Sequence, residues 1–176
     1  SSLPNGEANF LEDKDNPPSR AYLKLWETFT VHGVRPKRLE HCLDLGSCPG
    51  GWTWVLQTLG CQVTSVDKAP LDEKISRLPR IDFLKRNAFG LKPSEVSQPD
   101  WIFSDIICFP KKLYELVVLW KQAHPQAKFV CTLKFQGQTD FEAIEMFQKI
   151  PDSRVLHLYN NKHEVTWINI PSPAAK

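Results

Sequence analysis

Short apolar runs alternate with amphipathic segments along most of this chain, and that alternation limits the fold more than any other feature. Apolar runs of strand length predict seven strands, over residues 39–45, 61–67, 81–83, 100–105, 127–134, 153–161 and 163–170. Apolar residues at helical spacing predict helices over residues 20–33, 51–60, 111–124 and 139–150. Strands that alternate with helices build βαβ units, so the pattern predicts an α/β fold with a mostly parallel sheet.

The order and ends of these elements add detail to the predicted fold. The last two strands follow each other across a polar turn at residues 160–162, so we expect one antiparallel strand among the seven. Helices are expected on both faces of the sheet, because parallel strands are buried on both sides. Ser19 is predicted to cap the first helix, with Gly33 as its stop, and Thr139 or Asp140 is predicted to cap the last.

The length of 176 residues suits one domain, which we expect over residues 19–170, between a polar lead (1–18) and a short tail (171–176). Hydrophobic residues make up 41% and charged residues 24%, which excludes a disordered chain. The net charge of +2 is too small to establish a nucleic-acid partner without a local basic patch. The apolar runs are too short to span a bilayer and no signal-peptide pattern is present, so we expect no membrane partner.

The five cysteines give no sign of a disulfide framework or a zinc site. Their number is odd, and no pair shows the C-x-x-C spacing of a metal or redox motif. A free cysteine behaves as a small hydrophobe, and three of the five lie in or beside apolar runs. This pattern favours free thiols in a reducing compartment, so we expect a cytoplasmic protein without a metal. We also expect a monomer.

A glycine-rich loop follows the first predicted strand, with the sequence GSCPGGW from Gly46. In open α/β sheets, ligands bind beyond the carboxyl ends of the strands, where this loop lies. The helix that begins near Trp52 has free N–H groups that favour a carboxylate or phosphate. Asp67 ends the second strand, 67 − 46 = 21 residues after Gly46, where an acid is suited to accept the hydroxyls of an adenosine ribose. The loop predicts an adenosine-cofactor site; the alternative is a turn that only packs tightly.

The loop also narrows the choice of cofactor. The dinucleotide motif G-x-G-x-x-G is absent, because Cys48 stands at its second glycine. The phosphate-binding motif G-x-x-x-x-G-K-[ST] also fails, because Trp52 stands where lysine is needed. S-adenosylmethionine is therefore the leading candidate, and an oxidoreductase that binds NAD is disfavoured.

Five stretches of the chain together match the motifs of one known family. They are DLGSCPGGWTWVL (44–56), PSRAYLKLWE (18–27), DWIFSDI (100–106), FVCTLKF (129–135) and LYNNKHEVTWI (158–168). In these stretches the chain resembles the FtsJ-type ribose 2′-O-methyltransferases. The resemblance runs in order from about Pro18 to Ile168. It implies a Rossmann-like class I methyltransferase fold, S-adenosylmethionine as the cofactor and an RNA partner, expected to be ribosomal RNA.

The family is defined by a Lys-Asp-Lys-Glu tetrad, which the matching motifs carry over to Lys24, Asp105, Lys134 and Glu164. The resemblance also implies a set of cofactor-binding residues: Gly46, Ser47, Pro49, Gly50, Gly51, Trp52, Asp67, Asp82, Asn87 and Asp105. Within that set, Asp82 and Asn87 would lie near the adenine, and Asn87 stands where related enzymes often have Asp.

The predicted topology agrees with this tetrad without help from the family. Asp105 and Lys134 directly follow predicted strands, at the carboxyl edge where the glycine loop lies. Glu164 begins an antiparallel last strand, whose start lies at the same edge. Lys24 lies in a helix that can cross that edge. Taken singly, a lysine at a strand end is usually solvated and an aspartate there usually caps a helix; together, the four are expected to converge beside the methyl donor.

A ribose 2′-hydroxyl is a poor nucleophile, so the site must align oxygen, carbon and sulfur and manage one proton. Lys134 is predicted either to accept that proton as a neutral amine or to stabilise the developing negative charge on oxygen.

Candidates for phosphate contacts are Arg35, Lys37, Arg38, Lys111, Lys112 and Lys162, and Phe109, Pro110 and Phe135 are candidates for a base pocket. The alternatives are ordinary solvated lysines and aromatic residues that only form the core.

Two other functions stay open at this point. One is a methyltransferase of the same fold that acts on another acceptor, and the other is a non-catalytic domain that binds donor or RNA. The nearest relative in the family carries an additional N-terminal RNA-binding region, whereas this chain has only a short polar lead. We therefore expect either a stand-alone catalytic domain or a chain without that region.

Overall fold

A computed structural model of the chain describes residues 10–172. Its centre is one seven-stranded sheet with the strand order β3-β2-β1-β4-β5-β7-β6. The strands are β1 (His41–Leu45), β2 (Gln62–Asp67), β3 (Ile81–Lys85), β4 (Trp101–Ser104), β5 (Lys128–Lys134), β6 (Ser153–Leu156) and β7 (Glu164–Asn169). β7 pairs antiparallel with both of its neighbours, and the other pairs are parallel. This confirms the predicted α/β fold with one antiparallel strand.

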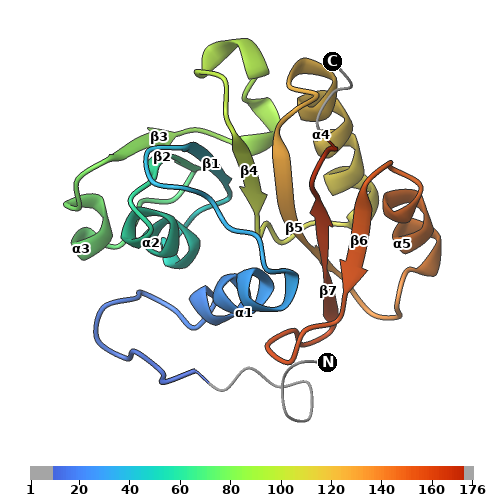
Figure 1. Ribbon diagram of the computed structural model, residues 1–176, viewed down its shortest axis with the longest axis horizontal. Helices are drawn as coiled ribbons and strands as arrows, with labels where there is room; N and C mark the ends of the chain where they lie inside the picture. The colour runs from blue at the N-terminus through green and yellow to red at the C-terminus, as the bar shows by residue number, and fades with distance from the viewer. Residues whose placement is uncertain (1–9, 173–176) are drawn as a thin grey trace.

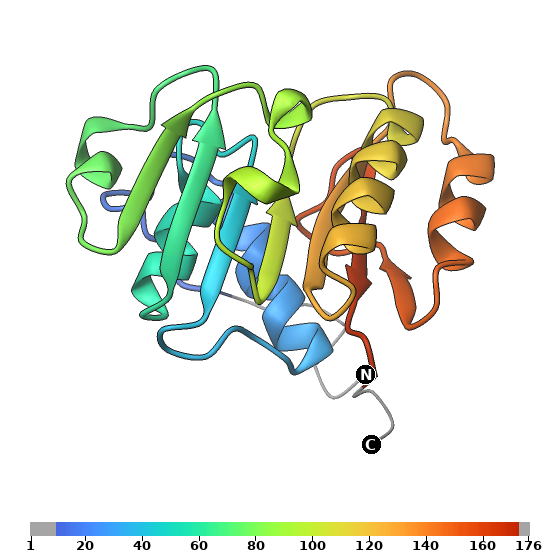
Figure 2. The same ribbon diagram turned by 90° about the horizontal axis from the view of Figure 1, so that it is seen from above.

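Helices cover both faces of this sheet, as Figures 1 and 2 show. The α-helices are α1 (Tyr22–His32), α2 (Gly51–Thr58), α3 (Glu73–Ser76), α4 (Pro110–Ala123) and α5 (Phe141–Gln148), with two 3-10 turns, η2 (Ala88–Gly90) and η3 (Pro93–Glu95). α1 and α2 pack on one face around Trp52 and Phe103, and α4 and α5 on the other around Trp120 and Trp167. Adjacent residues of β1 point to opposite clusters, Cys42 to the first and Leu43 to the second.

The strand register brings the predicted site to one edge of the sheet. Leu45 of β1 lies beside Val66 and Ser104, so these three parallel strands end together. The antiparallel register pairs Lys134, the last residue of β5, with Glu164, the first residue of β7. The loops after β1, β2 and β4 and the turn before β7 therefore meet at a single edge.

Several local predictions differ from the structure. The first helix is capped by Ala21 rather than Ser19, and no side chain bonds to its first turn. The predicted strand over 153–161 ends at Leu156, after which the chain turns at residues 158–161. The 3-10 turns and α3 were not predicted. By contrast, Gly33 ends α1 with φ 77° and Asp140 caps α5 through its side chain, as predicted.

The domain limits of residues 19–170 stay a prediction. Residues 1–9 of the polar lead and 173–176 of the tail lie outside the described residues. In the part of the chain that the structure describes, no helix has both the length and the apolar character needed to cross a membrane.

Candidate functional site

The glycine loop after β1 folds back against β2 and the loop after β4. The backbone N–H groups of Gly46 and Ser47 both donate to the carbonyl oxygen of Val66, at 2.8 and 3.1 Å. Gly46 has φ 76°, and a Cβ there would collide with the side chain of Ile106. Only glycine meets both conditions, since it tolerates positive φ and leaves room for the neighbouring chain.

Asp67 holds this loop from the end of β2. One carboxylate oxygen accepts from the N–H of Cys48 at 3.0 Å, and the other accepts from the N–H of Ala69 at 2.9 Å. Gly50 lies at the start of α2 with φ 116°, packed against Ile75 and Leu71 rather than lining the cavity described next. Its part in the site is to turn the backbone.

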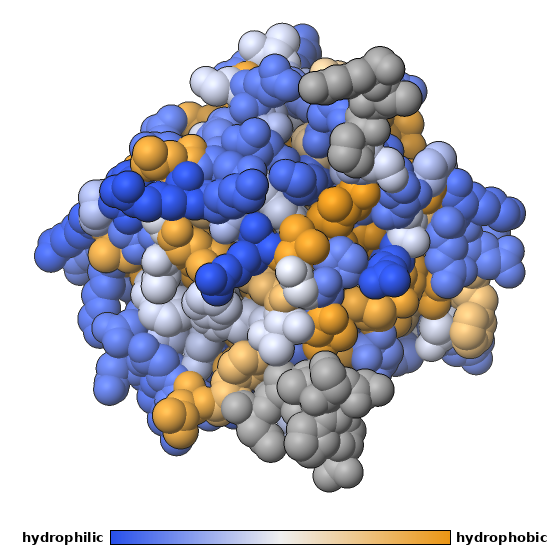
Figure 3. Space-filling view, viewed as in Figure 1, coloured by the Kyte–Doolittle hydropathy of each residue, from blue (hydrophilic) through white to orange (hydrophobic). Residues whose placement is uncertain are grey.

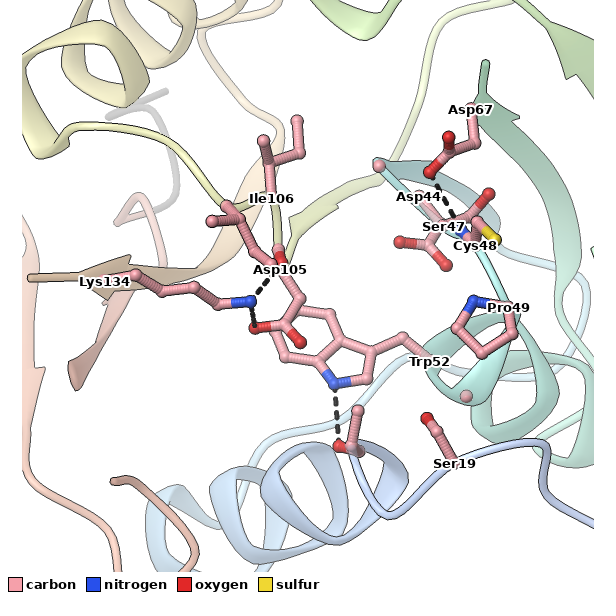
Figure 4. A pocket seen from close by; sticks show the side chains of 14 residues that line it. Ser19, Asp44, Ser47, Cys48, Pro49, Trp52, Asp67, Asp105, Ile106 and Lys134 are labelled. Atoms are coloured by element: carbon pink, nitrogen blue, oxygen red, sulfur yellow. Dashed lines mark hydrogen bonds and ion pairs between the residues drawn. The ribbon is translucent and has the colours of Figure 1, made fainter. Parts of the chain in front are cut away.

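Two adjoining cavities lie in front of the loop. The first, of ≈ 330 Å³, is called here the loop cavity; Figure 4 shows Ser47, Cys48, Pro49 and Asp67 on one side of it and Asp105, Ile106 and Lys134 on the other. The second, of ≈ 410 Å³, is called the side cavity and is lined by Asn87, Phe89, Phe109 and Lys112. Gly46, Asp67, Ile106 and Ile107 line both, so the two form one continuous cleft.

Two serine hydroxyls line the loop cavity without hydrogen-bond partners. The Oγ atoms of Ser19 and Ser47 are both buried, and neither has a partner among the described residues. A buried hydroxyl without a partner is unfavourable, so rotation of either side chain toward a polar ligand in this cavity would give its hydroxyl a partner. Sequence analysis missed Ser19 as a site residue because serine ahead of a helix is a strong capping signal.

Asp44 of β1 is a buried carboxyl group that lines the same cavity. Burial, together with the charges of Asp105 and Asp67, raises its pKa to about 7, although a hydrogen bond from Thr53 Oγ1 at 2.7 Å acts to lower it. A cation bound in the loop cavity would favour the ionised form of Asp44. Sequence analysis missed this residue as well, because an acid inside an apolar strand gave no sign of facing a ligand.

The four tetrad side chains form one chain of ion pairs. Lys24 Nζ lies 2.8 Å from Asp105 Oδ1 and 2.9 Å from Glu164 Oε1. Lys134 Nζ lies 3.2 Å from the same Asp105 oxygen and donates to the Asp105 carbonyl oxygen at 2.6 Å. Two ammonium groups and two carboxylates thus alternate. Their side chains are only 10–19% exposed, so the group lies in a recess.

The tetrad separates the loop cavity from a third cavity. Asp105 and Lys134 line the loop cavity, while Lys24, Lys134 and Glu164 line the third, which is open and measures ≈ 800 Å³. We call it the outer cavity; its lining also includes Arg20, Ile107, Phe135, Tyr159, Lys162 and His163. A group entering from the outer cavity meets Lys134 before the loop cavity.

A buried carboxylate on α1, which sequence analysis missed, supports the turn before β7. Glu27 accepts hydrogen bonds from the N–H of Tyr159 at 2.7 Å and of Asn160 at 2.9 Å, and a third from the Asn160 side chain at 2.7 Å. Asn161 in turn donates to Glu164 at 3.4 Å. Figure 1 shows this turn beside α1. The only sequence feature that could have indicated Glu27 was its position one helical turn after Lys24.

The remaining predicted cofactor residues lie in different places. Trp52 lines the loop cavity, and its indole N–H donates to the Ala21 carbonyl oxygen at 2.9 Å. Asn87 lines the side cavity, where its side chain accepts from the N–H of Phe89. Asp82 is the second residue of β3, near the amino end, and lines a separate cavity with His41 and Gln62. The expected adenine contact of Asp82 therefore does not fit, because the cleft lies at the carboxyl edge.

The predicted phosphate-contact residues are also divided. Lys162 lines the outer cavity and Lys112 the side cavity, whereas Lys111 pairs with Glu142 at 3.5 Å. Residues 35–38 lie before β1, at the amino edge of the sheet, so Arg35, Lys37 and Arg38 do not flank the tetrad.

The three residues predicted as candidates for a base pocket differ in exposure. Phe109 is 63% exposed and lines the side cavity, and Phe135 lines the outer cavity, where its ring meets that of His163 edge-on. Pro110 is buried at the start of α4, so it forms part of the core. Within residues 10–172, no group of three or more His, Cys, Asp or Glu side chains is arranged to hold a metal ion.

Comparison with known proteins adds a family to this geometry. Residues 17–160 match the family model described as FtsJ-like methyltransferase. The proteins named ribosomal RNA large subunit methyltransferase M from Thauera aminoaromatica and Halorhodospira halophila are 30% and 28% identical to the chain. Each alignment covers 86% of this chain but only 45% and 46% of the relative. The chain therefore spans about half the length of these curated relatives.

Solved structures share the fold at low sequence identity. The fibrillarin of Aeropyrum pernix, solved with S-adenosyl-L-methionine bound, has a TM-score of 0.60 and 14% identity, over 82% of this chain and 73% of its own. At this identity the likeness shows the fold alone. The family match agrees with the cofactor predicted from the sequence.

Proposed function

The chain belongs to the FtsJ-like methyltransferase family, and from that premise we propose that it transfers a methyl group from S-adenosylmethionine to a ribose 2′-hydroxyl of RNA, with ribosomal RNA as the substrate class. The observation that carries the proposal is the recessed tetrad between the loop cavity and the outer cavity. The names of the curated relatives support ribosomal RNA as the substrate.

The residues of the cleft fit the proposed donor. The free N–H groups at the start of α2 suit its carboxylate, and the buried carboxyl of Asp44 suits its ammonium group. Asp67 lines both cavities and suits the hydroxyls of a ribose, and the hydroxyls of Ser19 and Ser47 gain partners. The bound donor supplies a methyl group on a positively charged sulfur, which is a good leaving group.

The tetrad suits the acceptor side of this transfer. The 2′-oxygen forms a bond to the methyl carbon while the carbon–sulfur bond breaks, and the sulfur keeps the electron pair. Of the three N–H donors of Lys134, two have partners, both on Asp105, which leaves one for the 2′-oxygen. Lys134 positions that oxygen and stabilises the negative charge that develops on it, while the hydroxyl proton passes to solvent water through the open outer cavity. Asp105 holds Lys134 and Lys24 through one shared oxygen atom.

Methyl transfer to RNA tests the proposal. Protein-free ribosomal RNA is incubated with S-adenosylmethionine labelled in its methyl group, digested to nucleosides and analysed for labelled 2′-O-methyl nucleosides. We expect the label on ribose for the wild type and none for Lys134→Ala, with similar donor affinity for both proteins by calorimetry. Label on a base would contradict the ribose assignment. Donor binding without RNA labelling would indicate another acceptor or a non-catalytic domain.

A further inference from the structure

The proposed function does not specify which part of the RNA occupies the outer cavity. The tetrad side chains are 10–19% exposed, so a 2′-hydroxyl must enter a recess to reach Lys134. In a base-paired A-form helix, the 2′-hydroxyls lie along a wide, shallow groove, between neighbouring nucleotides. A paired nucleotide cannot bring its ribose into a recess without leaving the stack, so the nucleotide that reacts has to be unpaired or extruded.

Two exposed apolar side chains stand on either side of the recess. Ile107 follows β4 and is 79% exposed, and Tyr159 precedes β7 and is 67% exposed. The strand order β4-β5-β7 puts them on the two sides of Lys134, which ends β5. Both line the outer cavity. Phe135, the residue after β5, also lines it and lies between the two along this edge of the sheet. Large apolar side chains with this exposure are suited to be covered by a ligand.

The backbone beneath Tyr159 is fixed although its ring is exposed. Its N–H and that of Asn160 are held by the buried carboxylate of Glu27, at 2.7 and 2.9 Å. The backbone that carries the ring therefore needs no ordering when a ligand covers it, which favours binding. Aromatic rings on a fixed backbone are the usual stacking platforms for unpaired bases, because every base has a π-face.

Charges at the rim fit the same occupant. Arg20 and Lys162 both line the outer cavity. Arg20 Nε pairs with Glu12 at 3.4 Å, whereas Lys162 can meet a phosphate beside the bound nucleotide. Figure 3 shows hydrophilic and apolar side chains mixed over the face of the molecule seen in Figure 1.

On these grounds we propose that the outer cavity binds the base of a single unpaired RNA nucleotide, stacked on Tyr159 and covered from the other side by Ile107. The inference rests on the proposed function and adds to it the kind of acceptor: a nucleotide outside a duplex. It assigns Tyr159 as a binding residue, Glu27 as the residue that positions it, and Lys162 as a phosphate contact.

Oligonucleotide binding tests the assignment of Tyr159. The probe is a fluorescent, unstructured 12-nucleotide RNA, compared with the same RNA annealed to its complement, by anisotropy over a series of salt concentrations. We expect Tyr159→Ala to weaken binding of the unpaired RNA about tenfold with an unchanged salt slope, and Tyr159→Phe to restore it. Lys162→Ala should instead lower the salt slope by about 0.7, as loss of one phosphate contact to a single strand requires. Leu119→Ala, exposed on α4, is the matched control.

Methyl transfer to ribosomal RNA, measured at a saturating concentration of S-adenosylmethionine, completes the test. Tyr159→Ala should raise the KM for RNA while donor affinity stays the same, and annealing a complementary strand over the target should abolish transfer. Equal RNA affinity of the wild type and Tyr159→Ala, or equal transfer to the paired target, would overturn the inference. If the wild type still labels ribose when either result is found, the proposed function stands without this inference. If the wild type neither binds nor labels RNA, the proposed function and this inference both fall.

Discussion

At the scale of single residues, the site is a balance of charges that no one residue explains. Asp105 is its centre, because one of its carboxylate oxygens contacts both Lys24 and Lys134. Removing one member of such a buried network leaves its partners uncompensated, which is more damaging than removing an exposed ion pair. The residues of the tetrad therefore matter to stability as well as to the proposed chemistry.

Asp105→Asn is expected to separate these two effects. Within residues 10–172, the substitution removes the only carboxylate that contacts both ammonium groups. The free energy of unfolding should therefore fall by about 3 kcal/mol, and methyl transfer should be lost. Urea denaturation measures the first effect and RNA labelling the second. Asp15→Asn, exposed before α1, is the control. An Asp105→Asn protein of wild-type stability would contradict the ion-pair account.

Asp44 gives the donor site a predicted pH dependence. Its pKa of about 7 in the folded protein lies above its ordinary value of 3.8. The neutral form of Asp44 therefore makes its full contribution to the free energy of unfolding below pH about 4. This contribution, on the order of 4 kcal/mol, is lost as the pH rises through about 7. Asp44→Asn should remove that part of the pH dependence of unfolding.

The same titration should appear in donor binding. Because an ionised Asp44 attracts the donor ammonium group, affinity for S-adenosylmethionine should rise between pH 6 and 8 in the wild type. Calorimetry at several pH values measures this rise, which should be absent in Asp44→Asn. A wild-type affinity independent of pH over this range would show that Asp44 does not meet the ammonium group.

Ser19 lines the loop cavity and does not cap the first helix, as its sequence context predicted it would. A helix cap would make Ser19→Ala destabilising by about 1 kcal/mol. Because Ser19 does not cap α1 and its buried Oγ has no partner among residues 10–172, we expect almost no loss of stability. Affinity for S-adenosylmethionine should fall about tenfold, as the loss of one or two hydrogen bonds implies. Thermal unfolding and calorimetry on the same samples decide between the two roles.

At the scale of secondary-structure elements, α1 connects the catalytic proposal to the acceptor proposal. Lys24 enters the tetrad, and Glu27, one turn further along the same helix, holds the turn before β7. That turn carries Tyr159, and through Asn161 it also contacts Glu164. A shift of α1 would therefore move both the tetrad and one wall of the outer cavity.

Glu27→Gln tests this connection. The amide keeps one acceptor oxygen but turns an N–H₂ group toward N–H donors, so unfolding free energy should fall by about 1–3 kcal/mol. RNA should bind more weakly while S-adenosylmethionine binds as before, because the loop cavity is not lined by Glu27. Glu115→Gln, exposed on α4, is the control. Wild-type RNA affinity in a stable Glu27→Gln protein would contradict a positioning role.

At the scale of the whole molecule, function depends on the ends of strands that are far apart in the sequence. Lys24 and Glu164 are separated by 140 positions yet lie 2.9 Å apart, because β7 returns antiparallel between β5 and β6. The two hydrophobic clusters on the faces of the sheet hold this register, and β7 contributes Trp167 to one of them. The sheet therefore acts as a rigid support for the site.

A ligand that binds only the folded protein must stabilise the whole sheet. At a free concentration 100 times its Kd, S-adenosylmethionine should add about 2.7 kcal/mol to the free energy of unfolding and raise Tm accordingly. Lys134→Ala should show the same increase, and NAD should give none. An increase with NAD but not with S-adenosylmethionine would overturn the cofactor assignment.

The sequence by itself determined the order of strands and helices, the glycine loop and the charges at strand ends. These features are local: Gly46 and Gly33 are needed where the backbone has positive φ, and an apolar run of strand length needs burial wherever it lies. The parallel order then put Asp105 and Lys134 at one edge, because parallel strands end together.

Only the tertiary structure decided where each side chain points and which groups lack partners. Asp82 looked like an adenine contact, but β3 begins just before it, so it lies at the amino edge. Glu27 and Ser19 gain their places from a turn and a loop that are distant in sequence. Spacing along a chain fixes the face of a helix or strand. The contact between Glu27 and Tyr159, 132 positions apart, depends on how those faces pack, which the sequence alone does not reveal.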